Sequence, residues 1–252
     1  MEIDLEKLPF DLDFHPSSPL VTVGLITGDL HLYRYAAIGT QPEKVFEIHA
    51  HEESCRAVRF INVGTVILTA SPDFSILATD VQTGATIARL DNAHEAAVNR
   101  LVNLTETTIA SGDDNDCIKV WDTRQRTCCN SFDAHEEYIS DMTYAADSLK
   151  LLGTSLIGIL PSRIIQPIAE HSEYPVERLD LGKLPFDLDF HPSSPLVTAG
   201  LITGDLHLYR YAAIGTHPEK TGATIARLDN AHEQPVNRLV NLIETTIASR
   251  RR

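Results

Sequence analysis

The feature that most constrains this chain is a tripeptide, Ala-His-Glu, that returns at nearly regular intervals. It begins at Ala50, Ala93, Ala134 and Ala231, and a variant, Glu170-His171-Ser172, lies between the last two. The histidines of the first three copies are 43 and 41 residues apart. A period of about 40–45 residues is typical of the four-stranded blades of a β-propeller. The spacing therefore predicts a fold built from repeated small sheets.

Each period contains four short runs of β-branched and other apolar residues, separated by turn residues such as Gly64 and Ser71-Pro72-Asp73. This pattern indicates strands rather than helices, because no segment keeps a helical period beyond one or two turns. In the second period the runs are 54–61, 66–70, 75–79 and 85–90. The third period predicts strands at 98–104, 107–111, 117–121 and 126–132. The stretch before His51 predicts strands at 8–14, 20–25, 30–35 and 45–48. The predicted class is all-β.

We expect residues 1–252 to form a single propeller-like domain. The predicted blades are approximately 8–50, 51–93, 94–134 and 135–170, followed by a lone strand near 176–181, a hybrid blade at 184–230 and a partial blade at 231–249. A propeller protects its sheet edges by closing into a ring. The partial blade has only two predicted strands, and residues 2–6 supply only one of the two that are missing. The sequence therefore predicts antiparallel blades in a propeller that is incomplete or irregularly closed.

Two long blocks of the chain are near-identical copies of earlier blocks. Residues 4–44 recur at 180–220 with 38 of 41 positions identical, and residues 83–111 recur at 221–249 with 26 of 29 identical. Residues 45–82 have no second copy. Blades of one propeller normally share only a few spaced positions, so this likeness indicates a recent duplication with an internal deletion or a misassembled gene sequence. Both origins stay open.

Composition excludes several classes of function. The net charge of −14 disfavours a nucleic-acid groove as the main surface, so we expect no direct nucleic-acid binding. No apolar run approaches the roughly 20 residues of a membrane span, and the acidic start lacks the basic region of a secretory signal. The four cysteines, two of them adjacent at Cys128 and Cys129, do not resemble a disulfide framework. We therefore expect a reduced, intracellular chain without membrane contact.

The third period resembles the WD-repeat family. Ala93-His94 is followed after a gap by Ile118-Lys119-Val120-Trp121-Asp122, and repeats of that family start with Gly-His and end with Trp-Asp. The resemblance implies a hydrogen-bonded set in each blade: a His before the first strand, a Ser or Thr on the second, an Asp in the next turn and a Trp on the third. Such a set satisfies buried polar atoms that would otherwise be costly.

The resemblance assigns this set to particular residues. In the third blade it implies His94, Ser111 or Asp113, Asn115 at the turn position, and Trp121. In the second blade it implies His51, Ser71 and Asp73, with Thr79 at the Trp position, and His135 opens the fourth set. The first blade is degenerate, because Tyr33 and Arg34 stand in place of Trp and Asp.

Several phrases of the chain resemble one plant branch of the WD-repeat family. They are 8–16, 53–60, 71–80 and a later segment, 158–175, which follows the fourth blade's opening strands out of the family's order. Animal relatives of this branch imply a nuclear or nucleolar scaffold in ribosomal RNA processing. The expected localisation is the nucleus, including the nucleolus, and the cytoplasm. A different alternative is that the chain is a rearranged gene copy without function.

The segment Trp121-Asp122-Thr123-Arg124 suggests a docking motif. WD-repeat proteins with Trp-Asp-x-Arg at this place are often substrate receptors that dock on the β-propeller adaptor of a cullin–RING ubiquitin ligase. Arg124 offers a planar fork of donors for a partner's carboxylate or carbonyl groups, and Asp122 is positioned to orient it. The motif prefers an acidic residue at the position of Asn115, which Asp114 adjoins. The expected partner-binding residues are Asp114, Asp122 and Arg124.

No catalytic or metal-binding pattern emerges from the sequence. His49, His51 and Cys55 lack the second ligand cluster of a zinc site, and the acidic string beginning at Asp113 lacks the Gly and Glu of a calcium loop. No phosphate-binding loop or nucleophile motif is present. We expect a non-catalytic protein with protein partners, no cofactor and no metal.

Overall fold

A computed structural model describes most of the chain. The residues it describes are 3–35, 41–133, 139–145, 150–155, 159–164, 177–180, 185–190, 196–210, 223–229, 231, 238–243 and 246–250. Their secondary structure consists of β-strands and one short 3-10 helix, η1 (Asn62–Gly64). The all-β prediction is confirmed. The structure divides the chain into two compact units, Met1–Phe132 and Asp133–Arg252, and the single propeller-like domain stays a prediction.

The first unit consists of three four-stranded antiparallel sheets, each with its strands in sequence order. The first sheet contains β1 (Pro9–Phe14), β2 (Leu20–Leu25), β3 (Asp29–Arg34) and β4 (Glu43–His49). The second contains β5 (Ala57–Ile61), β6 (Val66–Ala70), β7 (Ile76–Asp80) and β8 (Thr86–Leu90). The third contains β9 (Val98–Thr105), β10 (Thr108–Asp113), β11 (Cys117–Asp122) and β12 (Thr127–Asp133). Each sheet has the strand number and order of a propeller blade.

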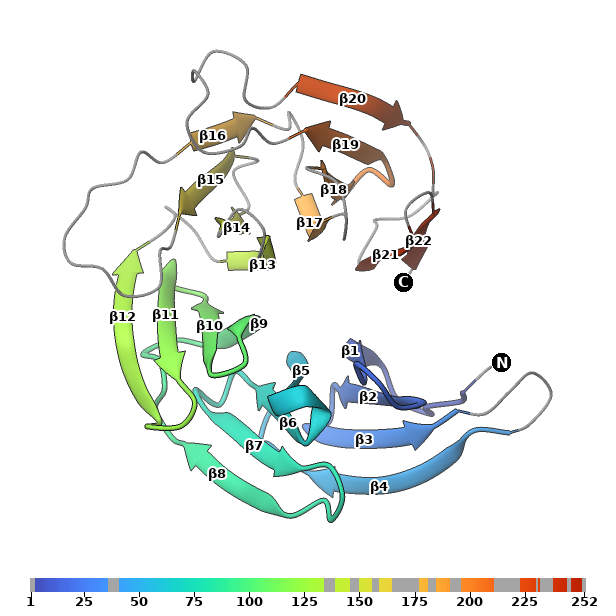
Figure 1. The fold of residues 1–252 in the computed structure, drawn as a ribbon, viewed down its shortest axis with the longest axis vertical. Helices are drawn as coiled ribbons and strands as arrows, with labels where there is room; N and C mark the ends of the chain where they lie inside the picture. The colour runs from blue at the N-terminus through green and yellow to red at the C-terminus, as the bar shows by residue number, and fades with distance from the viewer. Residues whose placement is uncertain are drawn as a thin grey trace. The chain divides into compact units, whose positions relative to one another are not determined.

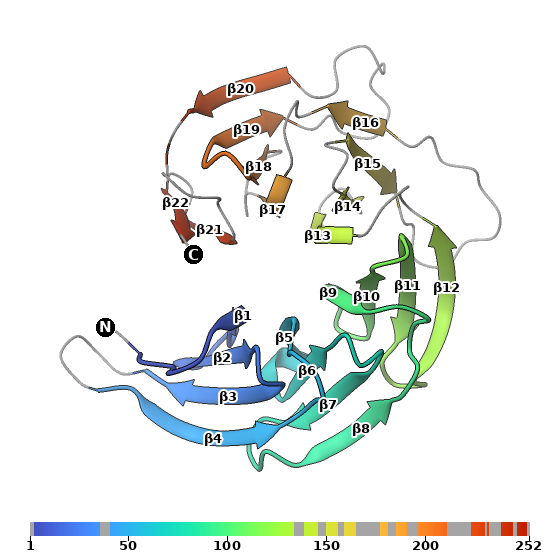
Figure 2. The same cartoon turned by 180° about the vertical axis from the view of Figure 1, so that it is seen from behind.

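Opposite views of this unit show the first strand of each blade at one side and the fourth at the other (Figures 1 and 2). The space between consecutive blades is filled by apolar side chains from both. Leu30 and Leu32 of the first blade pack with Val58 and Ile67 of the second, and all four are fully buried. A second cluster joins the second and third blades and includes Trp121. Burial on both faces explains why these strands read as near-continuous apolar runs rather than strict alternation.

Polar groups on the inner strands add specific links between consecutive blades. The Asp11 carboxylate on β1 accepts hydrogen bonds from the Val58 amide of β5 at 3.1 Å and from the Arg59 guanidinium at 2.5 Å. The Asn103 side chain on β9 donates to the Phe60 carbonyl of β5 at 2.7 Å. Asp11 is only 5% exposed, and a buried carboxylate needs such donors to stay ionised. These bonds fix the register of one blade against the next.

The second unit contains two four-stranded antiparallel sheets and one two-stranded sheet. The first sheet is β13 (Ile139–Ala145), β14 (Lys150–Ser155), β15 (Ile159–Ile164) and β16 (Glu177–Asp180). The second is β17 (Pro185–Phe190), β18 (Leu196–Leu201), β19 (Leu206–Arg210) and β20 (Ala223–Leu228). The last two strands are β21 (Arg238–Ile243) and β22 (Thr246–Arg250).

Two details of this unit bear on the sequence predictions. The strand expected to stand alone near 176–181 is β16, which pairs with β15 and completes the fourth blade, so that blade extends past residue 170. The copied blade pairs its β17, β18 and β19 as the original pairs β1, β2 and β3, but its fourth strand comes from the other copied block. The incomplete or irregular closure of the propeller stays a prediction. Within the described part of the chain, no helix has the length and apolar character needed to cross a bilayer.

Candidate functional site

A complete hydrogen-bonded set lies in the third blade. His94 Nδ1 lies 2.7 Å from Asp113 Oδ2 and its Nε2 lies 2.6 Å from Ser111 Oγ. The Trp121 indole donates to the same Ser111 Oγ at 2.7 Å. Because a carboxylate only accepts, Nδ1 of His94 carries the proton and Nε2 accepts from the serine hydroxyl. Each polar atom of the set has a partner, which allows all four side chains to be buried.

The turn residue of this set is Asp113, which corrects the assignment of that role to Asn115. Asp113 ends β10, and its Oδ1 accepts hydrogen bonds from the backbone amides of Asn115 and Cys117, both at 2.9 Å. Burial by itself raises the pKa of Asp113, but the hydrogen bonds from His94 and Cys117 outweigh it and hold the pKa below its ordinary value. Asp113 therefore closes the β10–β11 turn and binds the histidine at once.

The second blade contains a set of different composition. His51 Nε2 lies 2.8 Å from Thr69 Oγ1, while its Nδ1 lies 2.9 Å from Ser75 Oγ and 3.3 Å from Asp73 Oδ2. Thr69 on β6 takes the role that the sequence assigned to Ser71. The Ser71 hydroxyl instead accepts the backbone amide of Asp73 in the β6–β7 turn at 3.2 Å. Ser71 follows the end of the strand, whereas Thr69 points from the strand into the blade.

The surroundings of this second set shift two pKa values strongly. Burial lowers the pKa of His51 to about 4, although Asp73 opposes the shift. Hydrogen bonds from Ser75 and the charge of His51 lower the pKa of Asp73 to about 2 against the effect of its burial. His51 is therefore neutral and Asp73 ionised near neutral pH. Thr79, at the Trp position, is fully buried, and its hydroxyl has no hydrogen-bond partner among the described residues.

The degenerate first blade places Tyr33 at the Trp position, where its hydroxyl bonds His31 Nδ1 at 3.0 Å. Arg34, at the Asp position, is exposed and pairs with Glu43 at 3.3 Å. His135 lies outside the described residues.

The predicted docking residues Asp122 and Arg124 lie together at the end of β11. Asp122 Oδ1 accepts the backbone amides of Arg124 at 2.8 Å and Gln125 at 3.1 Å, and its Oδ2 lies 3.3 Å from the Arg124 guanidinium. The Gln125 amide and the neighbouring Arg124 hold the pKa of Asp122 below its ordinary value. The Arg124 side chain is 69% exposed. An ionised Asp122 thus shapes the turn while the guanidinium faces solvent.

Asp114, the third predicted docking residue, does not join this pair. It lies in the β10–β11 turn before β11, whereas Arg124 follows β11, and a six-residue strand spans about 20 Å. Its carboxylate accepts from the Asn99 side chain at 2.5 Å and lies 3.8 Å from the Arg56 guanidinium. Asp114 therefore links the second and third blades, and the structure places it at the opposite end of the strand from Arg124.

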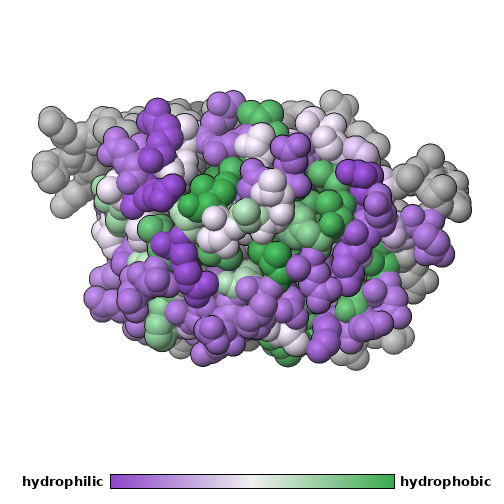
Figure 3. Space-filling model, turned by 90° about the horizontal axis from the view of Figure 1, so that it is seen from below, coloured by the Kyte–Doolittle hydropathy of each residue, from purple (hydrophilic) through white to green (hydrophobic). Residues whose placement is uncertain are grey.

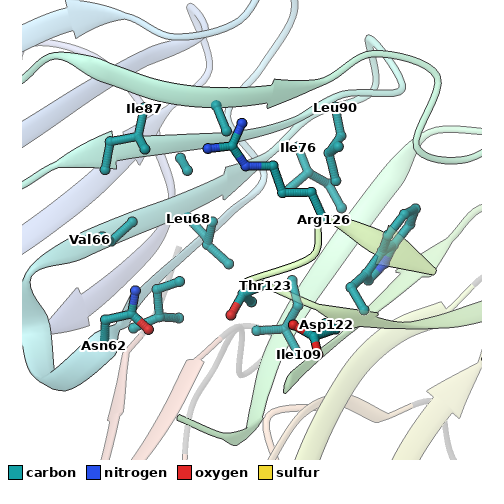
Figure 4. A pocket seen from close by; sticks show the side chains of 14 residues that line it. Asn62, Val66, Leu68, Ile76, Ile87, Leu90, Ile109, Asp122, Thr123 and Arg126 are labelled. Carbon is teal, nitrogen blue, oxygen red and sulfur yellow. The ribbon is translucent and has the colours of Figure 1, made fainter. Parts of the chain in front are cut away.

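A pocket that the sequence analysis did not identify lies beside the Asp122 turn. It has a volume of about 100 Å³ and opens between the second and third blades. Figure 4 shows apolar side chains around it, with the Arg126 side chain lying across it between Ile87 and Ile76. No carboxylate in the described part of the chain pairs with Arg126. The lining comes from six strands, η1 and the β11–β12 turn, which are spread over residues 61–126, so no local sequence motif reveals the pocket.

Comparisons with known proteins agree with this architecture. Residues 85–122 match the family model described as WD domain, G-beta repeat, which spans the third-blade set from before His94 to Asp122. The crystal structure of Saccharomyces cerevisiae Sqt1 superimposes with a TM-score of 0.72 at 17% identity, covering 92% of this chain and 64% of that one. At that identity the likeness shows the fold alone.

Two relatives have closely related names. The chain is 61% identical over 160 residues to WD repeat-containing protein 55 of Arabidopsis thaliana, covering 64% of this chain and 45% of that protein. It is 32% identical over 218 residues to the WD repeat-containing protein 55 homolog of Drosophila melanogaster, covering 86% of this chain and 42% of that protein. The chain thus spans a little under half the length of these relatives. The chain is thus built from propeller blades, one of which matches the WD-repeat model, and over part of its length it resembles WD repeat-containing protein 55 of plants.

Proposed function

We propose that the chain is a non-catalytic protein-interaction scaffold that docks, through Trp121 to Arg124, on the propeller adaptor of a cullin–RING ubiquitin ligase. The observation that carries this proposal is the state of Arg124. Its side chain is 69% exposed, and its backbone and guanidinium are both held by Asp122. A guanidinium whose position is fixed in advance loses less conformational entropy when a partner binds.

The neighbouring pocket supports a protein partner rather than a small molecule. Pockets for drug-sized ligands have volumes of about 300–1,000 Å³, whereas this one has about 100 Å³, which suits a single apolar side chain. Arg126 and Asp122 lie at its edge, and Ile87 in its wall is 45% exposed. An apolar anchor beside a charged rim is the usual composition of an interface hot spot. Figure 3 shows further apolar patches among hydrophilic residues on the face seen from the side of β4 and β8.

Co-purification of the adaptor with the full chain tests this proposal. We expect Arg124→Ala to reduce adaptor recovery at least tenfold while leaving the melting temperature unchanged. Arg34→Ala is the matched control, because Arg34 is also exposed and also pairs with a carboxylate. Equal adaptor recovery with Arg124→Ala and with the wild type would contradict docking through Trp121 to Arg124.

A nuclear or nucleolar role in ribosomal RNA processing is the second candidate, because the resemblance to animal relatives implies it and the chain is 32% identical to the Drosophila melanogaster homolog over 218 residues. Imaging of the tagged chain tests the proposed localisation in the nucleus, nucleolus and cytoplasm. Depletion should then lengthen the lifetime of precursor RNA, and unchanged precursor levels would count against this role.

A rearranged copy without function is the third candidate, supported by the near-identical duplicated blocks. Reading transcripts across residues 154–157, 179–181 and 220–221 tests it directly. Absence of any transcript crossing these joints would mean that the order of the blocks arises from sequence assembly.

A further inference from the structure

The first blade has a cluster of ionisable side chains on one face of its β3–β4 pair. Asp29 lies directly opposite His49, and His31 lies directly opposite Glu47, in the antiparallel register. One ligand atom from each of Asp29, His31 and Glu47 lies within 4.8 Å of the others. Alternate residues of a strand share a face, so the register of β3 and β4, which lie side by side in Figure 1, brings two acids and two histidines together.

The buried member of this cluster has an unsatisfied nitrogen. His31 is 5% exposed. Its Nδ1 bonds the Tyr33 hydroxyl at 3.0 Å, while its Nε2 has no hydrogen-bond partner among the residues that the structure describes. The nearest carboxylate to Nε2 is Glu47, at 3.5 Å and outside hydrogen-bond geometry. A buried nitrogen without a partner destabilises the fold, so a ligand that binds this nitrogen would remove that cost.

We propose that Asp29, His31 and Glu47 form a binding site for a divalent transition-metal ion of the Zn²⁺ type. A mixed set of one imidazole nitrogen and two carboxylate oxygens suits Zn²⁺ better than Mg²⁺ or Ca²⁺, which prefer oxygen ligands alone. The Tyr33 hydroxyl supplies the outer hydrogen bond that typically orients a ligating histidine. The sequence analysis expects no metal, because these ligands come from two strands joined only by their register.

The charges around the cluster favour a cation. Asp29 and Glu47 each bring a carboxylate oxygen to within 4.8 Å of the His31 imidazole, and the Nε2 of His31 is buried without a hydrogen-bond partner among the described residues. Lys44 bonds Glu47 Oε2 at 2.7 Å and competes with a metal for that oxygen.

The ligand atoms of the cluster need to move only slightly closer together to bind a metal ion. Tetrahedral Zn²⁺ with bonds of about 2.0–2.1 Å holds its ligand atoms about 3.3 Å apart. The Glu47 side chain is 49% exposed and moves inward on leaving Lys44. His49 Nδ1 donates to Asp29 Oδ1 at 2.8 Å, so this nitrogen is an outer partner of the Asp29 carboxylate rather than a ligand.

The copied blade repeats the arrangement with a different second strand. Asp205, His207 and Asp229 also place ligand atoms within 4.8 Å of one another, and His207 Nδ1 lies 2.8 Å from the Tyr209 hydroxyl. Asp205 and His207 belong to the copy of residues 4–44, but Asp229 comes from the other copied block. An acid therefore occupies the third position in both blades although the sequences that supply it differ. The chain should hold two ions.

Equilibrium dialysis of the full chain against Zn²⁺, with metal content measured by mass spectrometry, tests the proposal. We expect two bound ions in the wild type and one in Glu47→Gln, whose half-exposed position leaves the fold intact. The first site should weaken by more than about tenfold, since even loss of an outer-sphere partner costs 10–100-fold. Glu43→Gln is the matched control on the same strand and should keep both ions.

Two further variants complete the design. His31→Phe keeps the bulk of the ring and should also remove one ion, and His207→Phe should remove the other. The exposed Cys128 and Cys129 are alternative zinc ligands, so Cys128→Ser with Cys129→Ser should leave the content unchanged. The proposal is overturned if the wild type binds no Zn²⁺, if Glu47→Gln retains both ions at wild-type affinity, or if the cysteine variant loses them.

Discussion

The Trp121 indole donates to Ser111 Oγ at 2.7 Å, and this hydroxyl in turn donates to His94 Nε2. Ser111 lies in a chain of hydrogen bonds that runs from the Trp121 indole through His94 to the Asp113 carboxylate, with every donor pointing the same way. Because one hydroxyl satisfies both neighbours, its removal leaves two buried polar atoms without partners.

Ser111→Ala should therefore lower the free energy of unfolding by about 2–3 kcal/mol, the cost of an unpaired Trp121 donor and an unpaired His94 acceptor. Urea denaturation followed by Trp121 fluorescence measures this loss, since the chain has one tryptophan. Ser54→Ala makes the same chemical change at a half-buried site and should stay within about 0.5 kcal/mol of the wild type. Equal losses in the two variants would contradict the proposed chain.

Thr79→Val should raise the free energy of unfolding by up to about 1 kcal/mol. The Thr79 hydroxyl is buried without a partner among the described residues, and an isosteric methyl group removes its desolvation cost. Thr69→Val is the matched opposite case, because the Thr69 hydroxyl bonds His51 Nε2 at 2.8 Å. It should destabilise the chain by about 1–3 kcal/mol. Denaturation of both variants decides the point, and a loss of stability in Thr79→Val would contradict it.

Acidification from pH 6.5 to about 4 should reduce stability through His51. The pKa of His51 is about 4 in the folded chain and about 6.5 when unfolded. In this window the unfolded chain binds a proton that the folded chain does not, so the free energy of unfolding falls as the pH falls. The slope is at most about 1.4 kcal/mol per pH unit for one proton.

His51→Asn isolates that contribution, since it removes the titrating ring. The variant should be less stable at pH 7 but should lose less stability than the wild type between pH 6.5 and 4. Denaturant titrations at several pH values give both slopes, and identical slopes would contradict the role of His51. Below pH 4 Asp73 adds a second loss, because its pKa of about 2 lies below the ordinary value.

Limited proteolysis should cleave the chain first around β21 and β22. A sheet of two strands is only marginally stable in water, whereas four-stranded sheets that pack on neighbours are stable. Mass spectrometry of the fragments should show that the blades of residues 9–133 outlast residues 238–250. Uniform resistance up to Arg252 would contradict this and would also count against the predicted incomplete closure.

Sequence periodicity predicted the strands of the first three blades because four short apolar runs in every period of about 42 residues are typical of propeller blades and of few folds besides. Assignments within a blade were less accurate where two candidates lie two residues apart. In the second blade Thr69 lies on the strand and Ser71 follows its end, so Thr69 bonds the histidine. In the third blade Asp113 rather than Asn115 closes the turn.

The periodicity of the sequence does not predict which residues from different strands or blades come together. Asp114 and Arg124 are ten positions apart in sequence, yet β11 separates them. The pocket and the His31 cluster depend on register and on packing of neighbouring sheets, and neither leaves a local motif.

The Asp11 carboxylate that bonds the next blade's inner strand has a counterpart in the second unit, where Asp141 Oδ2 accepts the Leu188 amide at 2.7 Å. In both cases the acceptor and donor are 47 residues apart. In these two joints, the carboxylate that bonds the next blade belongs to the inner strand of the blade rather than to a separate linker. A duplication of this segment transmits the joint together with the sheet, and Asp187, the copy of Asp11, is buried as well. The copied blade therefore already carries the carboxylate with which the original blade bonds its neighbour.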